Sequence, residues 1–329
     1  MKRQLYHIEP IYKSFIWGGR ALIDHFHIKT DMENIGTIYH VIAIPGQLDN
    51  TVRETGEPLS VFYEKNPQVF QCREKSFPVR MTTTANSGFQ SYQLHPDDAY
   101  AEKHENQKGK VSGAVALKAS DHVSEWLFGN KAKNLEDFKR MVENKDWKNL
   151  FSTIKVKDGD YVHTPAGVIH GGYGKGLISA TFGTNGDITY RFYDNDRNDP
   201  SRPLHLQEVY DCVNIPEVPV GAKAVEPVRE NGLLIYHYYE KAGEYVAKRF
   251  IVKGKGNYSY QGFLFLTCVN GEGTIEDMPI GLGETILVPA DFGEIHFDGD
   301  MDLIAISYIE DDKDCLLYTS PSPRDKRQS

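Results

Sequence analysis

Three polar side chains alternate in the stretch SYQLHPDD, at positions Ser91, Gln93 and His95. Alternate side chains of an extended strand point to the same face, so these three share one face while Leu94 points to the other. A polar strand that stops abruptly at a proline is a common way to present ligands to a bound group. The pattern predicts either the wall of a polar site or an exposed strand end, and the stretch alone leaves both open.

The composition of the chain excludes several classes of partner. Its 329 residues carry a net charge of −9, with 37 basic and 46 acidic side chains, which argues against nucleic acid or an anionic membrane. No run approaches the ~18 apolar residues that cross a bilayer, and the first residues lack the apolar segment of a secretory signal. Four scattered cysteines without a C-x-x-C pair predict no disulfide framework. We therefore expect a soluble cytoplasmic protein, and its oligomeric state stays open.

Most of the chain consists of short β-branched or aromatic runs broken by Gly, Pro, Asn and Asp. Regularly spaced runs of this kind favour an all-β barrel or sandwich. The clearest examples are residues 34–46, 109–120, 232–240, 262–275 and 302–310.

Two segments read as helical instead. The acids that follow Pro96 are typical of a helix start, where the helix dipole favours negative charge. Residues 134–151 predict a helix that Asn134 caps. Its apolar residues recur at helical spacing: Leu135, Phe138, Met141 and Val142.

An internal echo suggests a repeated unit. Residues 159–166 read GDYVHTPA and residues 283–290 read GETILVPA, each followed by a further Gly and then by a histidine, His170 or His296. Such a repeat predicts two copies of one β-domain. The alternative is that the shared letters are a generic turn–strand–turn pattern.

Together these motifs resemble the class I mannose-6-phosphate isomerases, which belong to the cupin superfamily. The chain contains SYQLHPDD, PAGVIHGG and NGDITYRFYDNDR in the family's order, and KSFIWGGRAL lies near its start, at residues 13–22. The likeness runs from about residue 6 to about residue 312. It implies a mainly β fold of two cupin-type β-barrels (a bicupin). The N-terminal domain would span residues 1–225, with a helical insertion at about 95–107 and 134–151, and the C-terminal domain would span 226–312.

The resemblance also implies an activity and a site. Family members interconvert mannose 6-phosphate and fructose 6-phosphate and bind one zinc ion through Gln, His, Glu and His. Three ligand positions match Gln93, His95 and His170, whose donor types suit zinc, while the position of the glutamate is Ser112. We therefore expect a weakly held zinc ion. The remaining correspondences are a catalytic arginine, Arg191, phosphate contacts at Ser91 and Lys110, and a retained Asp187.

Other positions depart from the family pattern. A lysine expected after FP is Thr82, and two expected glutamates are Thr37 and Thr181. Arg80 shares a strand face with Thr82, so we expect it to supply the missing cation to the substrate's phosphate. The loss of these charged side chains suggests an alternative to the isomerase, namely a non-catalytic sugar-phosphate-binding or regulatory cupin. A third and weaker option is a cupin with changed chemistry on another sugar.

Three further histidines are also considered as structural residues or metal ligands. His296 lies in the second repeat, which lacks a Gln-x-His strand, so we interpret it as structural and expect the C-terminal barrel to hold no metal. His40 and His104 are candidates to replace the lost glutamate, without further support.

The last residues differ in character from the rest. From Cys315 to Ser329 the chain is rich in Ser, Pro and basic residues and has too little apolar content to fold. It resembles the in-frame translation of a sequencing adapter. We expect residues 313–329 to be a disordered, artefactual tail and exclude them from functional reasoning.

Overall fold

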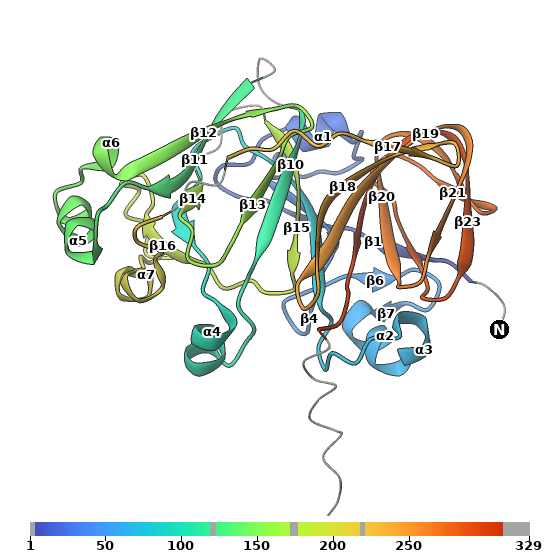
Figure 1. Ribbon diagram of the computed structural model, residues 1–329, viewed down its shortest axis with the longest axis horizontal. Helices are drawn as coiled ribbons and strands as arrows, with labels where there is room; N and C mark the ends of the chain where they lie inside the picture. Colours follow the sequence, from blue (N-terminus) through green and yellow to red (C-terminus); the bar gives the residue numbers. More distant parts are fainter. Residues whose placement is uncertain (1–3, 119–122, 172–176, 218–220, 312–329) are drawn as a thin grey trace, which may run out of the picture.

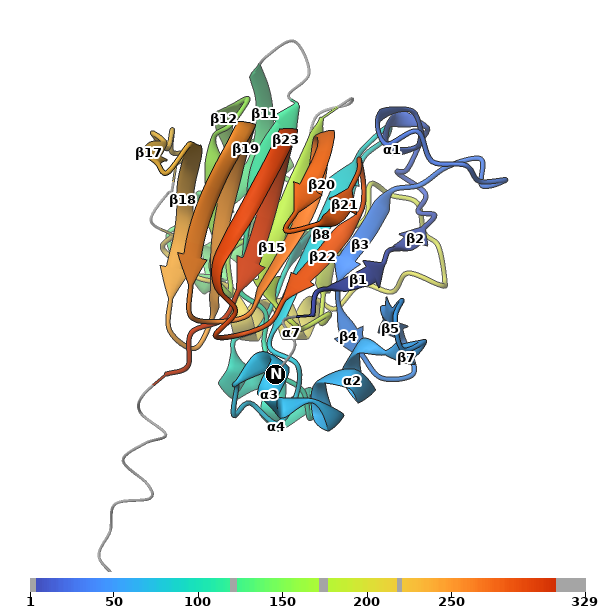
Figure 2. The same ribbon diagram turned by 90° about the vertical axis from the view of Figure 1, so that its right-hand side faces the viewer.

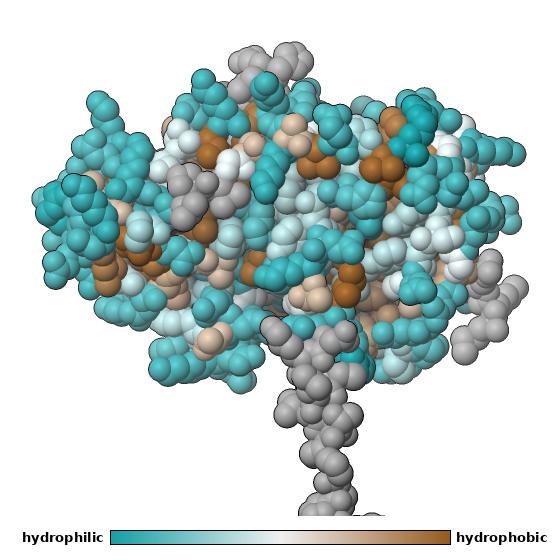
Figure 3. All heavy atoms as spheres, in the orientation of Figure 1, coloured by the Kyte–Doolittle hydropathy of each residue, from teal (hydrophilic) through white to brown (hydrophobic). Residues whose placement is uncertain are grey.

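The computed structural model describes residues 4–118, 123–171, 177–217 and 221–311, and strands dominate it (Figure 1). The prediction of a mainly β fold is confirmed. The tail predicted for residues 313–329 lies outside the described residues. Within the described ranges, no helix has the length and apolar character needed to span a membrane. The face drawn in Figure 3 is mainly hydrophilic, with hydrophobic residues in small scattered groups.

A ten-stranded antiparallel sheet forms one half of the molecule (Figure 2). Its main path runs β17 (Val228–Glu230), β18 (Leu233–Lys241), β19 (Tyr245–Tyr260), β23 (Gly293–Ser307), β20 (Leu264–Ile275), β22 (Thr285–Val288), β1 (Tyr6–Glu9), β6 (Thr51–Val52) and β7 (Glu57–Pro58). Strand β21 (Met278–Ile280) pairs with β20 outside this path. Strand β1 pairs with β22, so the beginning of the chain adds strands to the sheet that its last third builds.

Two smaller sheets form the other half. The six-stranded sheet runs β13 (Tyr161–Thr164), β10 (Ser112–Lys118), β15 (Ile178–Thr184), β8 (Val79–Ala85), β3 (Thr37–Val41) and β2 (Ile11–Lys13). The five-stranded sheet runs β12 (Phe151–Lys157), β11 (Val123–Asn130), β14 (His170–Gly171), β9 (Tyr92–Leu94) and β16 (Tyr190–Tyr193). A short pair, β4 (Ala43–Ile44) and β5 (Leu48–Asp49), stands apart.

The alternation of side chains along β8 explains how the six-stranded sheet serves two purposes. Val79 and Met81 are buried in the core shared with the ten-stranded sheet, whereas Arg80, Thr82 and Thr84 line a cavity on the opposite face. Apolar contacts fix the core face: the Phe77 and Phe265 rings lie 5.7 Å apart, edge to face. The pleat therefore turns one strand into both a core element and a cavity wall.

Seven helices are found in the described residues. They are α1 (Ala21–His25), α2 (Leu59–Lys65), α3 (Pro67–Phe70), α4 (Asp98–Glu105), α5 (Leu135–Glu143), α6 (Trp147–Leu150) and α7 (Leu206–Cys212). The predicted helix after Pro96 is confirmed as α4, and Asp97 caps it by accepting the Tyr100 N–H.

The helix predicted over 134–151 is divided. Asn134 caps α5 as predicted, with its side-chain oxygen 2.8 Å from the Asp137 nitrogen. The single long helix is wrong, because Lys145 adopts a left-handed φ of 52° between α5 and α6. Leu135 is also 39% exposed at the first turn, whereas Phe138 is buried.

The echoed segments adopt similar local structure. Gly159 (φ 82°) and Gly283 (φ 86°) both turn the chain in the left-handed region, which favours glycine. Each turn leads into a strand, β13 after Gly159 and β22 after Gly283. The three cysteines that the structure describes are free.

Candidate active site

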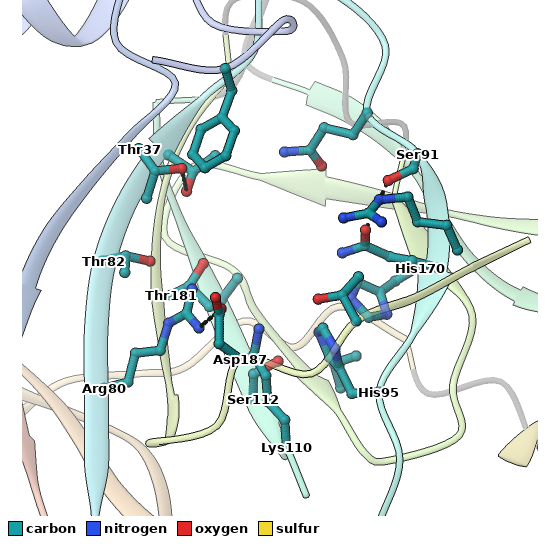
Figure 4. Close-up of a pocket in the computed structure, with 18 of the residues that line it drawn as sticks. Thr37, Arg80, Thr82, Ser91, His95, Lys110, Ser112, His170, Thr181 and Asp187 are labelled. Carbon is teal, nitrogen blue, oxygen red and sulfur yellow. Dashed lines mark hydrogen bonds and ion pairs between the residues drawn. The ribbon is translucent and has the colours of Figure 1, made fainter. Parts of the chain in front are cut away.

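A cavity of about 320 Å³ is lined by residues from both the six-stranded and the five-stranded sheets (Figure 4). All the predicted site residues line it: Arg80, Ser91, Gln93, His95, Lys110, Ser112, His170, Asp187 and Arg191. In the close-up, Ser91, His95 and His170 lie on one side and Thr37, Thr82 and Thr181 on the opposite side, with open space between them. The fold therefore brings together residues that are far apart in the sequence.

The two predicted imidazole ligands lie next to each other. Gln93 on β9 pairs directly with His170 on β14, and the His95 and His170 rings lie 4.8 Å apart. Each Nδ1–H donates to a backbone carbonyl, His95 to Ile188 O at 2.7 Å and His170 to Val168 O at 2.9 Å. Such bonds leave the Nε2 lone pairs available as donors to a metal.

Burial keeps both imidazoles neutral. Burial, together with the smaller effect of the nearby Lys110, lowers the pKa of His170 to about 4. The same two causes lower the pKa of His95 well below its usual range. Neutral imidazole is the form that binds a metal. Both rings are therefore in the state that zinc requires at pH 7.

Gln93 supplies the third donor. Its side-chain oxygen accepts a hydrogen bond of 2.9 Å from the Ser91 hydroxyl, which orients the amide and leaves the oxygen a second lone pair. Two neutral imidazoles and an amide oxygen fit three positions of a zinc site. Among the described residues, no group of three or more His, Cys, Asp or Glu side chains forms a metal-binding cluster.

Ser112 faces this cavity, as the sequence predicted. It begins β10 between Thr164 on β13 and Gly183 on β15, and its side chain is 6% exposed. Ser112 and Ala114 line the cavity while Val115 packs into the core. In Figure 4, Ser112 lies near Lys110 and Asp187. The position of the expected carboxylate is therefore a neutral hydroxyl inside the site.

Three threonines form the opposite wall. Thr82 and Thr181 are cross-strand partners on β8 and β15, and the hydroxyls of Thr37 and Thr84 lie 3.4 Å apart. Thr37 and Thr82 are buried. The positions where the resemblance implies charged groups, Thr37, Thr82 and Thr181, are thus neutral hydroxyls that line the cavity.

Arg80 and Asp187 form an ion pair of 2.5 Å at the cavity wall. Arg80 also bonds Gly186 O at 3.0 Å and lies 5.1 Å from the centre of the Tyr39 ring. Burial raises the pKa of Asp187, but Arg80 and then Lys110 outweigh it, so the net pKa is lowered and the carboxyl stays ionised. The expected extra cation is present, with its charge largely balanced by Asp187.

Lys110 is buried, with 8% exposure. Burial and the nearby Arg80 lower the pKa of its amine to about 7, and Asp187 offsets part of that shift. Lys110 lines the cavity together with Arg80 and Asp187, whose charges act on its amine. Lys110 can therefore hold or release a proton near neutral pH.

Arg191 projects from β16, where it pairs with Gln93 on β9. Its Nε is buried without a hydrogen-bond partner. The alternative role for Arg191 is a structural ion pair with Asp194 or Asp187. In the described residues Asp194 instead binds Arg197 at 2.7 Å and Arg202 at 2.9 Å, and Asp187 binds Arg80 at 2.5 Å. The Arg191 guanidinium is therefore available for a ligand.

The sequence reasoning missed several lining residues. His205 precedes α7, and its Nδ1 accepts a hydrogen bond of 3.3 Å from the backbone N–H of Arg191. Trp17 stacks on Phe15 with ring centroids 4.4 Å apart. The WGG motif was a signal for Trp17, whereas nothing in the spacing identified His205. Both line the cavity, as do Tyr39, Thr84, Gln90, Thr164 and Thr189.

His40 and His104, the two candidates to replace the glutamate, do not line the cavity. His40 is fully buried on the core side, where its Nε2 lies 3.0 Å from the Thr83 hydroxyl. His104 is exposed on α4 and stacks on Tyr100. That interpretation is wrong, because strand and helix orientation turn both rings away. His296 is exposed and lies 3.0 Å from both Glu276 and Glu294.

Relatives of the chain cover nearly its whole length. The probable mannose-6-phosphate isomerase GmuF of Bacillus subtilis is 30% identical over 306 residues, which are 89% of this chain and 95% of the relative. The crystal structure of the mannose 6-phosphate isomerase from Bacillus subtilis has a TM-score of 0.83 at 25% identity and covers 92% of this chain and 99% of that one. A zinc-bound mannose 6-phosphate isomerase shares the fold, with a TM-score of 0.73 at 13% identity over 93% of this chain and 99% of that one. No family model matches the chain.

Proposed function

The chain belongs to the mannose-6-phosphate isomerase family, and from this premise we propose that it interconverts mannose 6-phosphate and fructose 6-phosphate. The observation that carries the proposal is the convergence of Gln93, His95 and His170 with Lys110 and Arg191 on one cavity. The reaction moves a proton between C1 and C2 of the open-chain sugar through a cis-enediol. It needs a proton carrier, charge stabilisation at the oxygens and an anchor for the phosphate.

We propose zinc as the cofactor, held by Gln93, His95 and His170. Their donor chemistry supports this assignment, since both imidazoles are neutral and their Nδ1 atoms are fixed by backbone carbonyls. Bound zinc would supply a Lewis acid that polarises the sugar's carbonyl group. Ser112 adds no negative charge, so we expect the metal to be held weakly.

The substrate contacts follow from the remaining polar groups. Ser91, Lys110 and Arg80 are the proposed phosphate and hydroxyl contacts, and Asp187 holds the Arg80 guanidinium in place through the 2.5 Å ion pair. Arg191, with its unpartnered Nε, stabilises the negative charge that develops on the sugar oxygens. The amine of Lys110, with a pKa of about 7, can take up a proton when the phosphate binds beside it.

We also propose the finer architecture that the sequence predicted. Residues 1–225 form one cupin-type barrel with the helical insertion, and residues 226–312 form a second. The matching turns at Gly159 and Gly283 support a repeated unit. Strands β1, β6 and β7 belong to the ten-stranded sheet, so a boundary at residue 225 leaves three N-terminal strands in the sheet of the second domain. The cytoplasmic location and the absence of nucleic-acid and membrane partners stay predictions.

A second function is favoured by a specific observation. The cavity has neutral hydroxyls at Ser112, Thr37, Thr82 and Thr181, where the family carries charged groups. A sugar-phosphate-binding protein without turnover would keep the cavity and lose those groups. Binding of mannose 6-phosphate with no conversion to fructose 6-phosphate identifies this alternative.

The deciding experiment joins metal analysis to a coupled isomerase assay. Purified protein is assayed as isolated, after treatment with a chelator, and after zinc is added back. The isomerase proposal predicts activity that falls with chelation and returns with zinc. Absence of activity in all three samples, with intact fold by circular dichroism, contradicts it.

A further inference from the structure

The cavity carries an imbalance of charge. Among the described residues, two arginines, Arg80 and Arg191, and the amine of Lys110, which is partly charged at pH 7, line it against one carboxylate, Asp187. That carboxylate is already bound to Arg80 at 2.5 Å. The other lining groups of the described residues are neutral hydroxyls, amides, aromatic rings and imidazoles. The site is therefore electropositive although the whole chain has a net charge of −9.

Zinc would increase this imbalance. Gln93, His95 and His170 are all neutral donors, so the double charge of the ion would enter the cavity without an anionic ligand. Ser112 occupies the position of the expected carboxylate and is only 6% exposed. Bulk water therefore cannot fully screen the charge of a zinc ion at this point. Asp187 does not compensate, because it is held by Arg80.

One phosphate does not balance the site. A sugar monophosphate brings about two negative charges at one end of the molecule. The other end of mannose 6-phosphate is neutral, so no negative charge from it reaches the proposed metal donors. A ligand with a second anionic group at that end would supply the charge that Ser112 lacks.

We propose that this site preferentially binds sugar phosphates that carry a second anionic group, such as a carboxylate at C1, and that this ligand and zinc bind cooperatively. The inference rests on the proposed zinc and phosphate sites. A sugar-acid phosphate has no aldehyde to isomerise, so it acts as a tightly bound ligand that controls how much zinc the protein holds. Linkage requires that zinc and the ligand strengthen each other by the same factor.

The test measures zinc affinity by competition with a chelator. Zinc is titrated into the protein alone, with mannose 6-phosphate, and with 6-phosphogluconate as the sugar-acid phosphate. A titration without protein corrects for zinc bound by each sugar. We expect 6-phosphogluconate to raise the zinc affinity roughly 10–100-fold more than mannose 6-phosphate does, the range seen when an outer partner of a metal ligand is removed. Equal effects of the two sugars overturn the inference.

Two variants locate the effect at Ser112. Ser112→Ala removes the hydroxyl without adding charge and should keep the full difference between the two sugars. Ser112→Glu supplies the anion from the protein and should reduce that difference to less than about threefold, because the charge is already present. A difference in Ser112→Glu as large as in the native protein also overturns the inference. If Ser112→Glu fails to fold, the native and Ser112→Ala titrations still decide.

Failure of the proposed function has a different signature. If mannose 6-phosphate is neither bound nor converted while 6-phosphogluconate still strengthens zinc binding, the isomerase proposal fails and this inference stands. If mannose 6-phosphate is converted and both sugars affect zinc equally, the inference fails and the isomerase proposal stands. Calorimetric titration of 6-phosphogluconate with and without zinc should give the same coupling factor.

Discussion

The imidazole rings of His95 and His170 lie 4.8 Å apart, and each ring donates its Nδ1–H to a backbone carbonyl. Two separate parts of the sequence thus present two neutral nitrogen donors to one point, beside the amide of Gln93. The proposed zinc site therefore has three neutral donors in the described residues, and Ser112 adds no charge at the fourth position.

Ser112→Glu should tighten zinc binding at least 10-fold, and up to about 100-fold, because it restores an anion to a set of neutral donors. This corresponds to roughly 1.4–2.7 kcal/mol. Titration against a chelator, with Ser112→Ala as the matched control, measures the change. Equal zinc affinity of the Glu and Ala variants would show that position 112 does not act on the metal.

Arg80→Ala should weaken mannose 6-phosphate binding by roughly 1.5–3 kcal/mol, the range for hydrogen bonds to charged groups. The change also leaves Asp187 without its partner. Asp187→Asn is therefore the control: it removes the ion pair but keeps the guanidinium, which still donates to Gly186 O, so binding should fall less than in Arg80→Ala. Calorimetric affinity that is unchanged in Arg80→Ala would make Arg80 a structural residue.

Arg191→Ala should lower kcat roughly 10²–10³-fold with a smaller change in KM, as expected for a group that stabilises charge mainly in the transition state. The buried Nε without a partner is the basis for this expectation. Arg191→Lys should recover part of the loss by keeping the charge. A rise in KM alone, with kcat unchanged, would assign Arg191 to ground-state binding.

Phosphate binding should be coupled to protonation of Lys110. Burial lowers the pKa of its amine to about 7, so above pH 7 the free protein holds it largely neutral. A bound phosphate favours the ammonium form and raises this pKa, so at pH 8 binding should take up close to one proton from the buffer. At pH 6, where the amine is already largely charged, its contribution to the uptake should be small, and the phosphate's own second pKa near 6 adds a separate proton release.

Calorimetry in two buffers of different ionisation enthalpy measures that proton uptake. Lys110→Met, which keeps an apolar chain without the amine, should abolish the uptake at pH 8. Uptake that persists in the variant would place the titrating group elsewhere.

Phe265→Ala should lower the free energy of unfolding by about 3–5 kcal/mol, the usual cost of removing a buried aromatic ring. Phe265 is fully buried and contacts Phe77 and Phe263 where the six-stranded and ten-stranded sheets meet. Urea denaturation measures the loss. Phe89→Ala, at 65% exposure, is the control and should stay within about 0.5 kcal/mol of the native protein.

Local patterns in the sequence predict part of the fold and part of the candidate site. The two-residue spacing of Ser91, Gln93 and His95 predicted a shared face, and all three line the cavity. Asn134 was recognised as a cap because capping depends on a few neighbouring residues. Ser112 was selected by its match to a family position rather than by a local pattern, and it lines the cavity.

Other features depend on contacts that no local pattern encodes. The Arg80–Asp187 pair joins β8 to the loop before β16, and the approach of His205 to Arg191 depends on how α7 packs. His40 could not be excluded in advance, since only the packed sheet shows that it faces the core. The pairing of β1 with β22 likewise joins the two ends of the chain.

Isomerisation by this site can be tested directly by following mannose 6-phosphate by NMR in the presence of zinc and the native protein. We expect conversion to fructose 6-phosphate, with a rate that rises with zinc occupancy. We also expect His170→Ala, which removes one of the proposed zinc donors, to abolish this conversion. No conversion by the native protein at saturating zinc and substrate, with the sugar phosphate demonstrably bound, would contradict the account.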